Sequence, residues 1–503
     1  MRRLVVLAAL TTLVVAAVSA DAADNTFRYG VAAGDVTATS AVLWTRAPRP
    51  GAVTLTVSTS TSLPAGAFVV RATSGNDVTV HRVVRGLKPG TRYRYFFTQG
   101  RAKSAIGSFT TAPAARVAAS VRFAISGDAD ATPAPDGAPA FNRYEIYKRM
   151  RAEGNHFNIN LGDTIYSDSE VGGAPVARTV AEKRAKYKLG LALPALNALR
   201  TSAGLYSHWD DHEFINDFSK PEHGRAIYTA AVESFSDYSP VTYSTKLGLY
   251  RTFRWGKHLE LFFLDERSFR SAKATQACAG DLAPTAPQAV RDAFATLAPP
   301  LRNPIPPACL AAINDPSRTM LGARQYAAFT KAIAASTATW KVVVNEVPIQ
   351  QFFALPYDRW EGYAAERERL LRFLQANVRN VVFLTTDTHA NLVNEVRYRT
   401  LGGPPESSGI WEVVTGPVAT NTFAKEIDQL LGQPGTGTAV GALFFKPPPP
   451  NGMGMRCAAL DTYSYAQATV TARTLTVALR DARGRPVREA TGVACAPLVL
   501  TAR

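Results

Sequence analysis

The stretch from His156 to Glu170 reads His-Phe-Asn-Ile-Asn-Leu-Gly-Asp-Thr-Ile-Tyr-Ser-Asp-Ser-Glu. In its first part apolar and polar residues alternate, as in a short strand, and Gly162 permits the sharp turn that ends this strand. The carboxylate of Asp163 therefore falls at the carboxyl end of a strand, where open α/β sheets bind ligands. Tyr166 is near enough along the chain to reach the same point. Carboxylate and phenol oxygens suit a hard cation, while the alternative is a turn with a structural aspartate.

Other predicted strands end in the same way. Val121–Ser126 is followed by Asp128, and a helical pattern from Phe141 to Met150 leads on to the strand before Asp163. Such a strand–helix–strand unit predicts a parallel pair with a right-handed crossover, which sets the two aspartates side by side. Further predicted strands lead into Asp211 and His212, Arg267, Asn345, and Asp387 with His389.

These strand ends together offer the ligands of a two-metal centre for phosphate ester hydrolysis. Such a centre needs several hard ligands, one of them bridging, a metal-bound water as nucleophile and a proton donor for the leaving oxygen. The candidate ligands are Asp128, Asp163, Tyr166, Asp211, Asn345, Asp387 and His389. Asp163 is the expected bridge, because its strand lies between those that supply the other ligands. His212 directly follows Asp211 and is expected just outside the metal shell, as general acid or charge stabiliser.

Several candidates also have a structural alternative. Tyr166 could be a loop tyrosine packed on the sheet, and Asn345 could cap a turn. His212 could make only supporting hydrogen bonds to the metal ligands. Arg267 is a candidate for binding the substrate phosphate, with a salt bridge within the sheet as the equal alternative.

The composition describes a globular protein larger than one ordinary domain. The chain has 503 residues, of which 46% are hydrophobic, and this predicts two or three domains with a sizeable core. Its formal net charge of +16 favours anionic partners. The basic residues are dispersed, so we expect no dedicated nucleic-acid-binding surface. The sequence leaves the oligomeric state open, with a monomer as the simplest expectation.

The first residues have the features of a secretory signal peptide. Met-Arg-Arg precedes the apolar run Leu4–Val18, and cleavage could follow Ala20 or Ala22, which makes residues 1–22 the expected signal. No later apolar run approaches the roughly 20 residues of a transmembrane segment. We therefore expect an exported protein, periplasmic or extracellular.

The cysteines fit an oxidising compartment. Four of them allow three connectivities, and no Cys-x-x-Cys pattern points to a thiolate metal site. The nearest-neighbour choice pairs Cys278 with Cys309 and Cys457 with Cys495.

From Thr26 to about Pro113 the pattern is strand and turn throughout. Alternating runs such as Ala41–Thr45 and Arg92–Phe97 lie between clusters of glycine, proline, serine and threonine. This predicts a β-sandwich over residues 24–113, with Trp44 as a core aromatic, and a second domain over residues 121–503. The sandwich carries no converging titratable groups, so we expect it to have a packing or positioning role.

The motifs resemble the PhoD-like alkaline phosphatase D and phospholipase D family, which belongs to the calcineurin-like metallophosphoesterases. The matching stretches are Gly127-Asp128-x-Asp130, Leu161-Gly162-Asp163-x-x-Tyr166, Trp209-Asp210-Asp211-His212-Glu213, Asn216-Asp217-Phe218, Leu264-Asp265-x-Arg267, Asn345-Glu346-Val347-Pro348 and Thr386-Asp387-x-His389. The resemblance covers nearly the whole mature chain.

The resemblance implies a fold of the α+β or α/β class. Two central sheets flanked by helices would form a calcineurin-like layered metallophosphoesterase domain, preceded by a fibronectin III-like β-sandwich. It also implies a phosphoric ester hydrolase acting on phosphomonoesters and phosphodiesters at alkaline pH, exported by the twin-arginine route. The metals implied are Fe3+ and Ca2+, with other divalent ions as the alternative. The implied metal contacts are Asp163, Tyr166, Asp211, Asn345, Asp387 and His389.

Two positions depart from the family pattern. Asp128 stands where many members have cysteine, and this change from a soft to a hard ligand could alter the metal chosen. An aspartate at this position is closer to purple acid phosphatases, in which a tyrosinate binds iron. Thr386 stands where glycine is usual, so the last ligand loop is expected to differ slightly.

Two rival functions remain beside the phosphoesterase. A phospholipase D could use the same centre on phospholipid headgroups, although the chain has no obvious amphipathic membrane helix. A non-catalytic envelope-binding protein could keep the fold and use its sandwich for adhesion, although the complete ligand set speaks against it.

Overall fold

The computed structural model describes residues 26–59, 66–295, 298–352, 355–398, 406–445 and 454–503. The expected signal peptide, residues 1–22, lies outside these ranges. Within them, no helix is both long enough and apolar enough to cross a bilayer. Two disulfides form, Cys278–Cys309 and Cys457–Cys495, which confirms the nearest-neighbour pairing.

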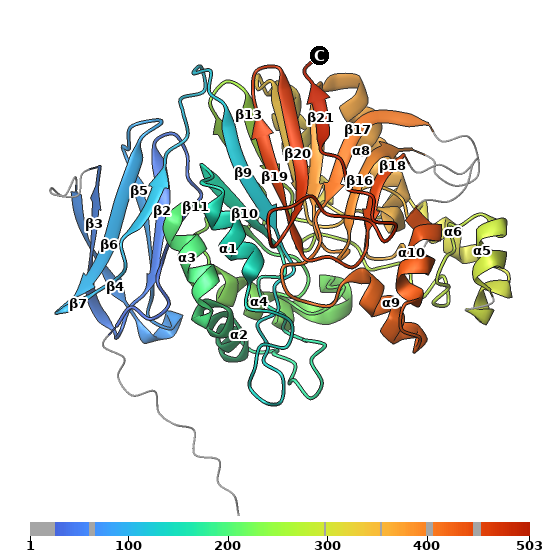
Figure 1. Ribbon diagram of the computed structural model, residues 1–503, viewed down its shortest axis with the longest axis horizontal. Coiled ribbons are helices and arrows are strands. Elements are labelled where there is room, and N and C mark those ends of the chain that lie inside the picture. The colour runs from blue at the N-terminus through green and yellow to red at the C-terminus, as the bar shows by residue number, and fades with distance from the viewer. Residues whose placement is uncertain (1–25, 60–65, 296–297, 353–354, 399–405, 446–453) are drawn as a thin grey trace, which may run out of the picture.

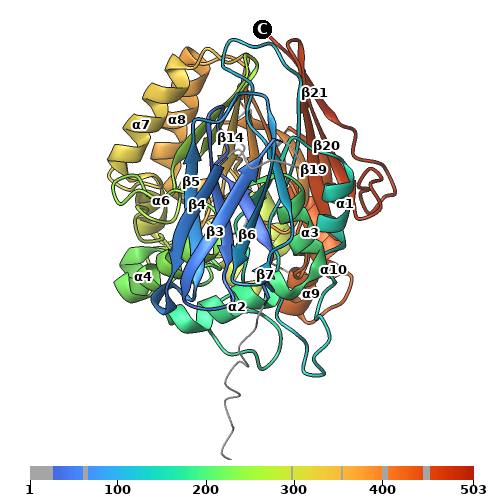
Figure 2. The same cartoon turned by 90° about the vertical axis from the view of Figure 1, so that its left-hand side faces the viewer.

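An antiparallel β-sandwich forms the N-terminal part of the chain and lies at the front of Figure 2. Its strands are β1 (Val31–Gly34), β2 (Ser40–Arg46), β3 (Gly51–Ser58), β4 (Gly66–Ala72), β5 (Thr79–Arg85), β6 (Arg92–Gln99), β7 (Ala102–Lys103) and β8 (Gly107–Thr110). One sheet has the order β1-β2-β5, and the other has the order β4-β3-β6-β7 with β8 paired to β6. Leu43 from the first sheet shares a buried core with Leu55 and Phe97 from the second.

Trp44 is fully buried, as predicted, but it lies outside the sandwich core. Because successive strand residues point to opposite faces, Trp44 points away from the core that holds Leu43. Its ring lies 6.1 Å from that of Tyr238, and its indole N–H donates to the carbonyl of Asp237 at 2.7 Å. Trp44 therefore joins the sandwich to the rest of the molecule.

Two larger sheets form the centre of the molecule (Figure 1). The first contains, in spatial order, β11 (Gly204–His208), β10 (Phe157–Leu161), β9 (Val121–Ser126), β19 (Ser464–Val470), β20 (Thr474–Asp481) and β21 (Leu498–Thr501). The second contains β12 (Arg251–Trp255), β13 (Leu259–Phe263), β14 (Trp340–Asn345), β15 (Val381–Thr385), β17 (Ser407–Val414), β16 (Asn391–Arg397) and β18 (Met455–Ala459). Phe123 and Ile159 of the first sheet share one core with Leu261 and Val342 of the second, so the sheets pack face to face.

Helices cover the outer faces of these two sheets, which gives four layers (Figures 1 and 2). On the side of the first sheet lie α1 (Glu145–Ala152), α2 (Val180–Ala192) and α3 (Pro194–Ser202). On the side of the second sheet lie α7 (Gly322–Ala335) and α8 (Ala364–Asn377). α4 (Lys220–Tyr238) contacts α2 and lies on the same side of Figure 2 as α7 and α8. The remaining helices are α5 (Gln288–Phe294), α6 (Pro307–Ile313), α9 (Phe423–Leu431) and α10 (Thr436–Phe445), with short 3-10 turns at Ser74–Asn76, Pro299–Arg302 and Trp360–Tyr363.

The carboxyl ends of strands from both sheets meet at one place. In the first sheet β10 is parallel to β9 and β11, and in the second β14 is parallel to β13 and β15. The Thr386 hydroxyl, just beyond β15, donates to the carbonyl of Leu161 at the end of β10, at 2.9 Å. His208 at the end of β11 contacts the carbonyl of Leu264, just beyond β13, at 2.6 Å. Loops that follow strands of either sheet therefore share one site.

Candidate metal centre

Tight turns at the strand ends place the candidate ligands. Four of these residues have a positive φ: 57° at Asp128, 48° at Asp163, 72° at Asp387 and 50° at His389. Few residues other than glycine adopt this left-handed region, so the turns are closely constrained. A Cβ atom at Gly162 would lie 2.4 Å from the Cβ of Asp210, which excludes any larger residue there without a shift.

Asp128, Asp163 and His389 form the first potential metal-binding group. Their ligand atoms all lie within 4.8 Å of one another, and all three side chains are buried. The Tyr166 hydroxyl lies 2.9 Å from Nε2 of His389, which brings the phenol to the same group. Oδ2 of Asp128 is buried and, within the described ranges, has no hydrogen-bond partner. This group thus combines two carboxylates, an imidazole and a phenol.

Asp163 also belongs to a second potential metal-binding group, with Asp211 and His212. The ligand atoms of this group again lie within 4.8 Å of one another. Asn345 ends β14, and its buried Oδ1 has no hydrogen-bond partner among the described residues. Asp163 therefore belongs to both groups, while Asp211 belongs to the second group and to two further acidic groups.

Arg267 is fully buried among carboxylates. Its guanidinium forms ion pairs with Asp210, with Asp358 at 2.7 Å, with Asp387 at 3.4 Å and with Asp211 at 3.6 Å. Its charge is thus already engaged within the protein. This arrangement favours the ion-pair alternative for Arg267 over direct phosphate binding. Two more acidic groups surround it, Asp210–Asp211–Asp387 and Asp211–Asp217–Asp358.

Two models of known protein families match this chain. The sequence model of the PhoD-like phosphatase matches residues 135–445, and that of the N-terminal domain of PhoD-like phosphatases matches residues 13–113. The chain belongs to the PhoD-like phosphatase family.

Relatives of this chain include alkaline phosphatase D of Bacillus subtilis (strain 168). The two are 27% identical over 421 residues, which cover 73% of this chain and 64% of the relative. The chain thus spans less than two thirds of that relative's length. A solved structure of PhoD superposes with a TM-score of 0.72 at 21% identity, covering 96% of this chain and 90% of the other. The structure of a purple acid phosphatase from yellow lupin (Lupinus luteus) seeds superposes with a TM-score of 0.57 at 11% identity, covering 94% of this chain and 74% of the other. These likenesses confirm the predicted layered fold.

His212 contacts a residue that sequence reasoning missed. Nδ1 of His212 lies 2.7 Å from a carboxylate oxygen of Asp168. The His212 ring also stacks on Tyr166, with 4.1 Å between the ring centroids. Asp168 lies within the stretch His156–Glu170. Its position in that stretch does not indicate a contact with a residue beyond β11.

Glu426 is a second residue that sequence reasoning missed. It lies on α9, and its carboxylate contacts Nδ1 of His389, leaving Nε2 directed toward Tyr166. Carboxylates in this position fix the orientation of a metal-binding histidine. Nothing in the sequence around Glu426 marks it as part of the centre.

The buried carboxylates of the centre strongly influence one another. Burial raises the pKa of Asp128 to about 7, although the charge of His389 acts in the opposite direction. Burial also holds the pKa of Asp163 well above its usual range, and the charge of Asp211 adds to the effect. Burial alone would lower the pKa of His212, but Asp163 and Asp211 hold it well above its usual value. So many buried negative charges are unfavourable without a cation among them.

The residues present fit hard metal ions. Carboxylate, phenol, amide and imidazole groups suit such ions, and two buried oxygens, on Asp128 and Asn345, have no protein partner in the described part of the chain. Burial and the Asp163 charge raise the pKa of Tyr166, so a tyrosinate there requires a neighbouring cation. The acidic groups therefore indicate metal binding, without identifying the metal.

Proposed function

We propose that this chain is an exported, metal-dependent phosphoesterase that hydrolyses phosphomonoesters and phosphodiesters. The observation that carries the proposal is the position of Asp163, which belongs to two adjacent groups of potential metal ligands. Two ions that share a carboxylate are typical of enzymes that displace groups at phosphorus. Family membership supports the reaction class, and the two disulfides support an oxidising compartment.

In this proposal Asp128, Asp163, Tyr166 and His389 hold Fe3+, because tyrosinate and carboxylate are hard ligands suited to a trivalent ion. Asp163 also holds Ca2+, together with the remaining predicted ligands Asp211, Asn345 and Asp387. When bound, such ions supply positive charge for the phosphoryl oxygens and lower the pKa of a nearby water molecule.

His212 and Asp168 supply the proton chemistry in this proposal. Asp168 accepts from Nδ1 of His212 and so fixes the orientation of the ring, with the proton for transfer on Nε2. Since Asp163 and Asp211 keep the pKa of His212 high, the imidazolium can donate a proton to the leaving oxygen. Arg267 acts as a positioning residue that holds Asp210, Asp211 and Asp387 in place.

The first experiment is an elemental analysis and visible absorption spectrum of protein purified without chelator, together with rates on nitrophenyl phosphate and bis-nitrophenyl phosphate. We expect stoichiometric iron, calcium, and a broad tyrosinate–iron band that disappears in Tyr166→Phe. Asp163→Asn should lose both the metals and the activity. Asp292→Asn is the matched control, since this exposed aspartate lies on α5 and accepts a hydrogen bond from Gln288 of the same helix. Full activity of Asp163→Asn would overturn the proposal, and a colourless active protein would overturn only the iron assignment.

A further inference from the structure

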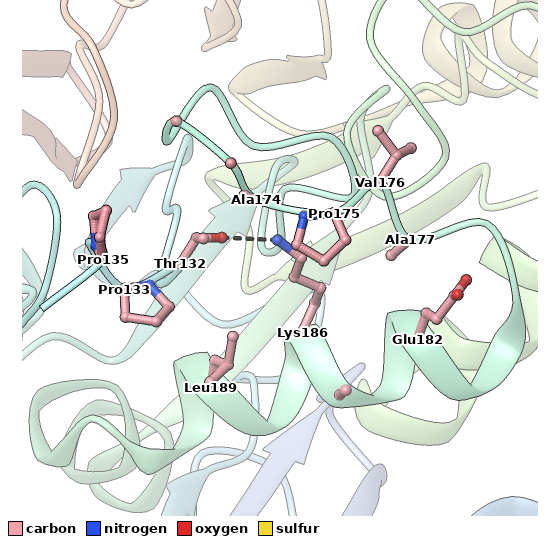
Figure 3. Close-up of a pocket in the computed structure, with 13 residues that line it drawn as sticks. Thr132, Pro133, Pro135, Ala174, Pro175, Val176, Ala177, Glu182, Lys186 and Leu189 are labelled. Atoms are coloured by element: carbon pink, nitrogen blue, oxygen red, sulfur yellow. Dashed lines mark hydrogen bonds between the residues drawn. The ribbon is translucent and has the colours of Figure 1, made fainter. Parts of the chain in front are cut away.

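An apolar pocket lies against α2 (Figure 3). It has a volume of about 720 Å³ and opens between the loop after β9 and the loop that leads into α2. Pro133 and Pro135 line one side, Pro175 and Val176 line the other, and Leu189 of α2 forms part of the base. A phosphoryl group needs only a small part of this volume. The pocket is therefore suited to an organic group, as concave apolar sites generally are.

Both walls of the pocket belong to loops that also carry proposed metal ligands. The Thr132 backbone N–H donates to Oδ1 of Asp130 at 2.7 Å, and Asp130 lies on the same turn as Asp128. On the opposite wall, the Ala177 backbone N–H donates to the carbonyl of Ser167, the residue after Tyr166, at 2.6 Å. Each wall is thus tied by a hydrogen bond to a loop that carries a proposed metal ligand.

Lys186 places one positive charge on the lining of the pocket. Its ammonium donates to the Thr132 hydroxyl at 2.9 Å, the dashed contact in Figure 3. No carboxylate within the described residues forms an ion pair with it. Burial lowers the pKa of Lys186, while the charges of Asp130 and Asp168 act in the opposite direction. An anionic group with an apolar substituent matches this combination.

We propose that this pocket is a specificity site for the apolar alkyl or acyl group of an amphipathic phosphate ester, whose phosphoryl group lies at the metal centre. The inference rests on the proposed phosphoesterase function and names its substrate class. Pro133, Val176 and Leu189 remove methylene groups from water, and Lys186 attracts the anionic end. Selectivity arises because a short-chain ester cannot bury this surface.

The test compares kcat/KM for ethyl, butyl and octyl phosphate, using the protein with its metals bound. We expect kcat/KM to rise about tenfold or more from ethyl to octyl phosphate, since each fully buried methylene contributes roughly fourfold. The variants Leu189→Asp and Ala185→Trp, which charge and fill the pocket respectively, should bring the octyl-to-ethyl ratio close to one. Val69→Asp is the control, because Val69 is 72% exposed on the distant β4 and should keep the ratio.

Binding measured without turnover gives a second readout. Octylphosphonate should bind more tightly than ethylphosphonate by calorimetry, and Leu189→Asp should remove the difference. Equal kcat/KM along the series, or an unchanged ratio in both pocket variants, would overturn the pocket assignment and leave the phosphoesterase intact. Failure to hydrolyse any of the esters with metals bound would overturn the proposed function, and the pocket assignment with it.

Discussion

At the scale of single residues, the contact between Asp168 and His212 is the one most directly tied to proton transfer. Asp168→Asn removes the negative charge that orients the imidazolium while keeping the side chain's shape. We expect kcat on nitrophenyl phosphate to fall about 10- to 100-fold, the usual effect of losing such a partner. Metal content should stay unchanged, and Asp292→Asn should retain full activity. An unaltered kcat and pH profile in Asp168→Asn would rule out this role.

A second residue-scale prediction concerns pH and the metal-free protein. Asp128 and Asp210 have folded-state pKa values of about 7 and about 8, raised mainly by burial from an ordinary value of 3.8. The stability linked to their protonation is complete below pH 3.8 and is lost as the pH rises through 7 and 8. His81 and His208, whose pKa burial lowers, oppose this trend only below pH 6.5.

Chelated protein should therefore lose thermal stability between pH 6.5 and 8, and Asp128→Asn should flatten the decline. Thermal melts by circular dichroism, with and without metals, measure the effect. Bound cations should suppress the decline, because they compensate the ionised carboxylates. A melting temperature that is independent of pH in chelated protein would contradict the assignment of these burial effects.

At the scale of elements, α9 contributes Glu426 to a centre otherwise built on strand ends. Glu426→Gln keeps the size of the side chain but weakens its hold on Nδ1 of His389. We expect the affinity for the ion held by His389 to fall about 10- to 100-fold, measured by competition with a chelator. Leu430→Gln is the control on the same helix, because Leu430 is 67% exposed. Equal losses in both variants would mean that α9 acts only through its packing.

At the scale of the whole molecule, Trp44 couples the N-terminal sandwich to the layered part. Its indole N–H donates a hydrogen bond to the carbonyl of Asp237, and the Arg200 guanidinium lies 4.5 Å from the centroid of the indole ring. Asp35 of the sandwich also forms a buried ion pair with Arg251 of β12. We therefore expect Trp44→Ala to lower the free energy of unfolding by about 3–5 kcal/mol in denaturant titrations.

The exposed Val69→Ala is the matched control for that titration and should change stability by less than about 0.5 kcal/mol. If Trp44→Ala gave an effect as small as the control, the sandwich would be an independent unit. Two separate unfolding transitions in the native sequence would point to the same conclusion. A single transition is the expected result.

The sequence alone determined the strands and the residue types at their ends. Val121–Ser126 forms the strand that was predicted, and the parallel pairing of β9 with β10 sets Asp128 and Asp163 just beyond the ends of adjacent strands. Period-two alternation and a turn after glycine depend only on neighbours in the chain, so they can be recognised without a fold. The family motifs identified the remaining candidate ligands.

Only the tertiary structure decided which distant side chains meet. Asp358 lies 91 residues from Arg267, and Glu426 lies 37 residues from His389, with no local pattern that pairs them. Likewise, alternation predicts that Trp44 is buried but cannot say against which element. The two-residue period of a strand specifies the face of the sheet to which a side chain points. The residues that this side chain contacts depend on how sheets and helices pack against one another.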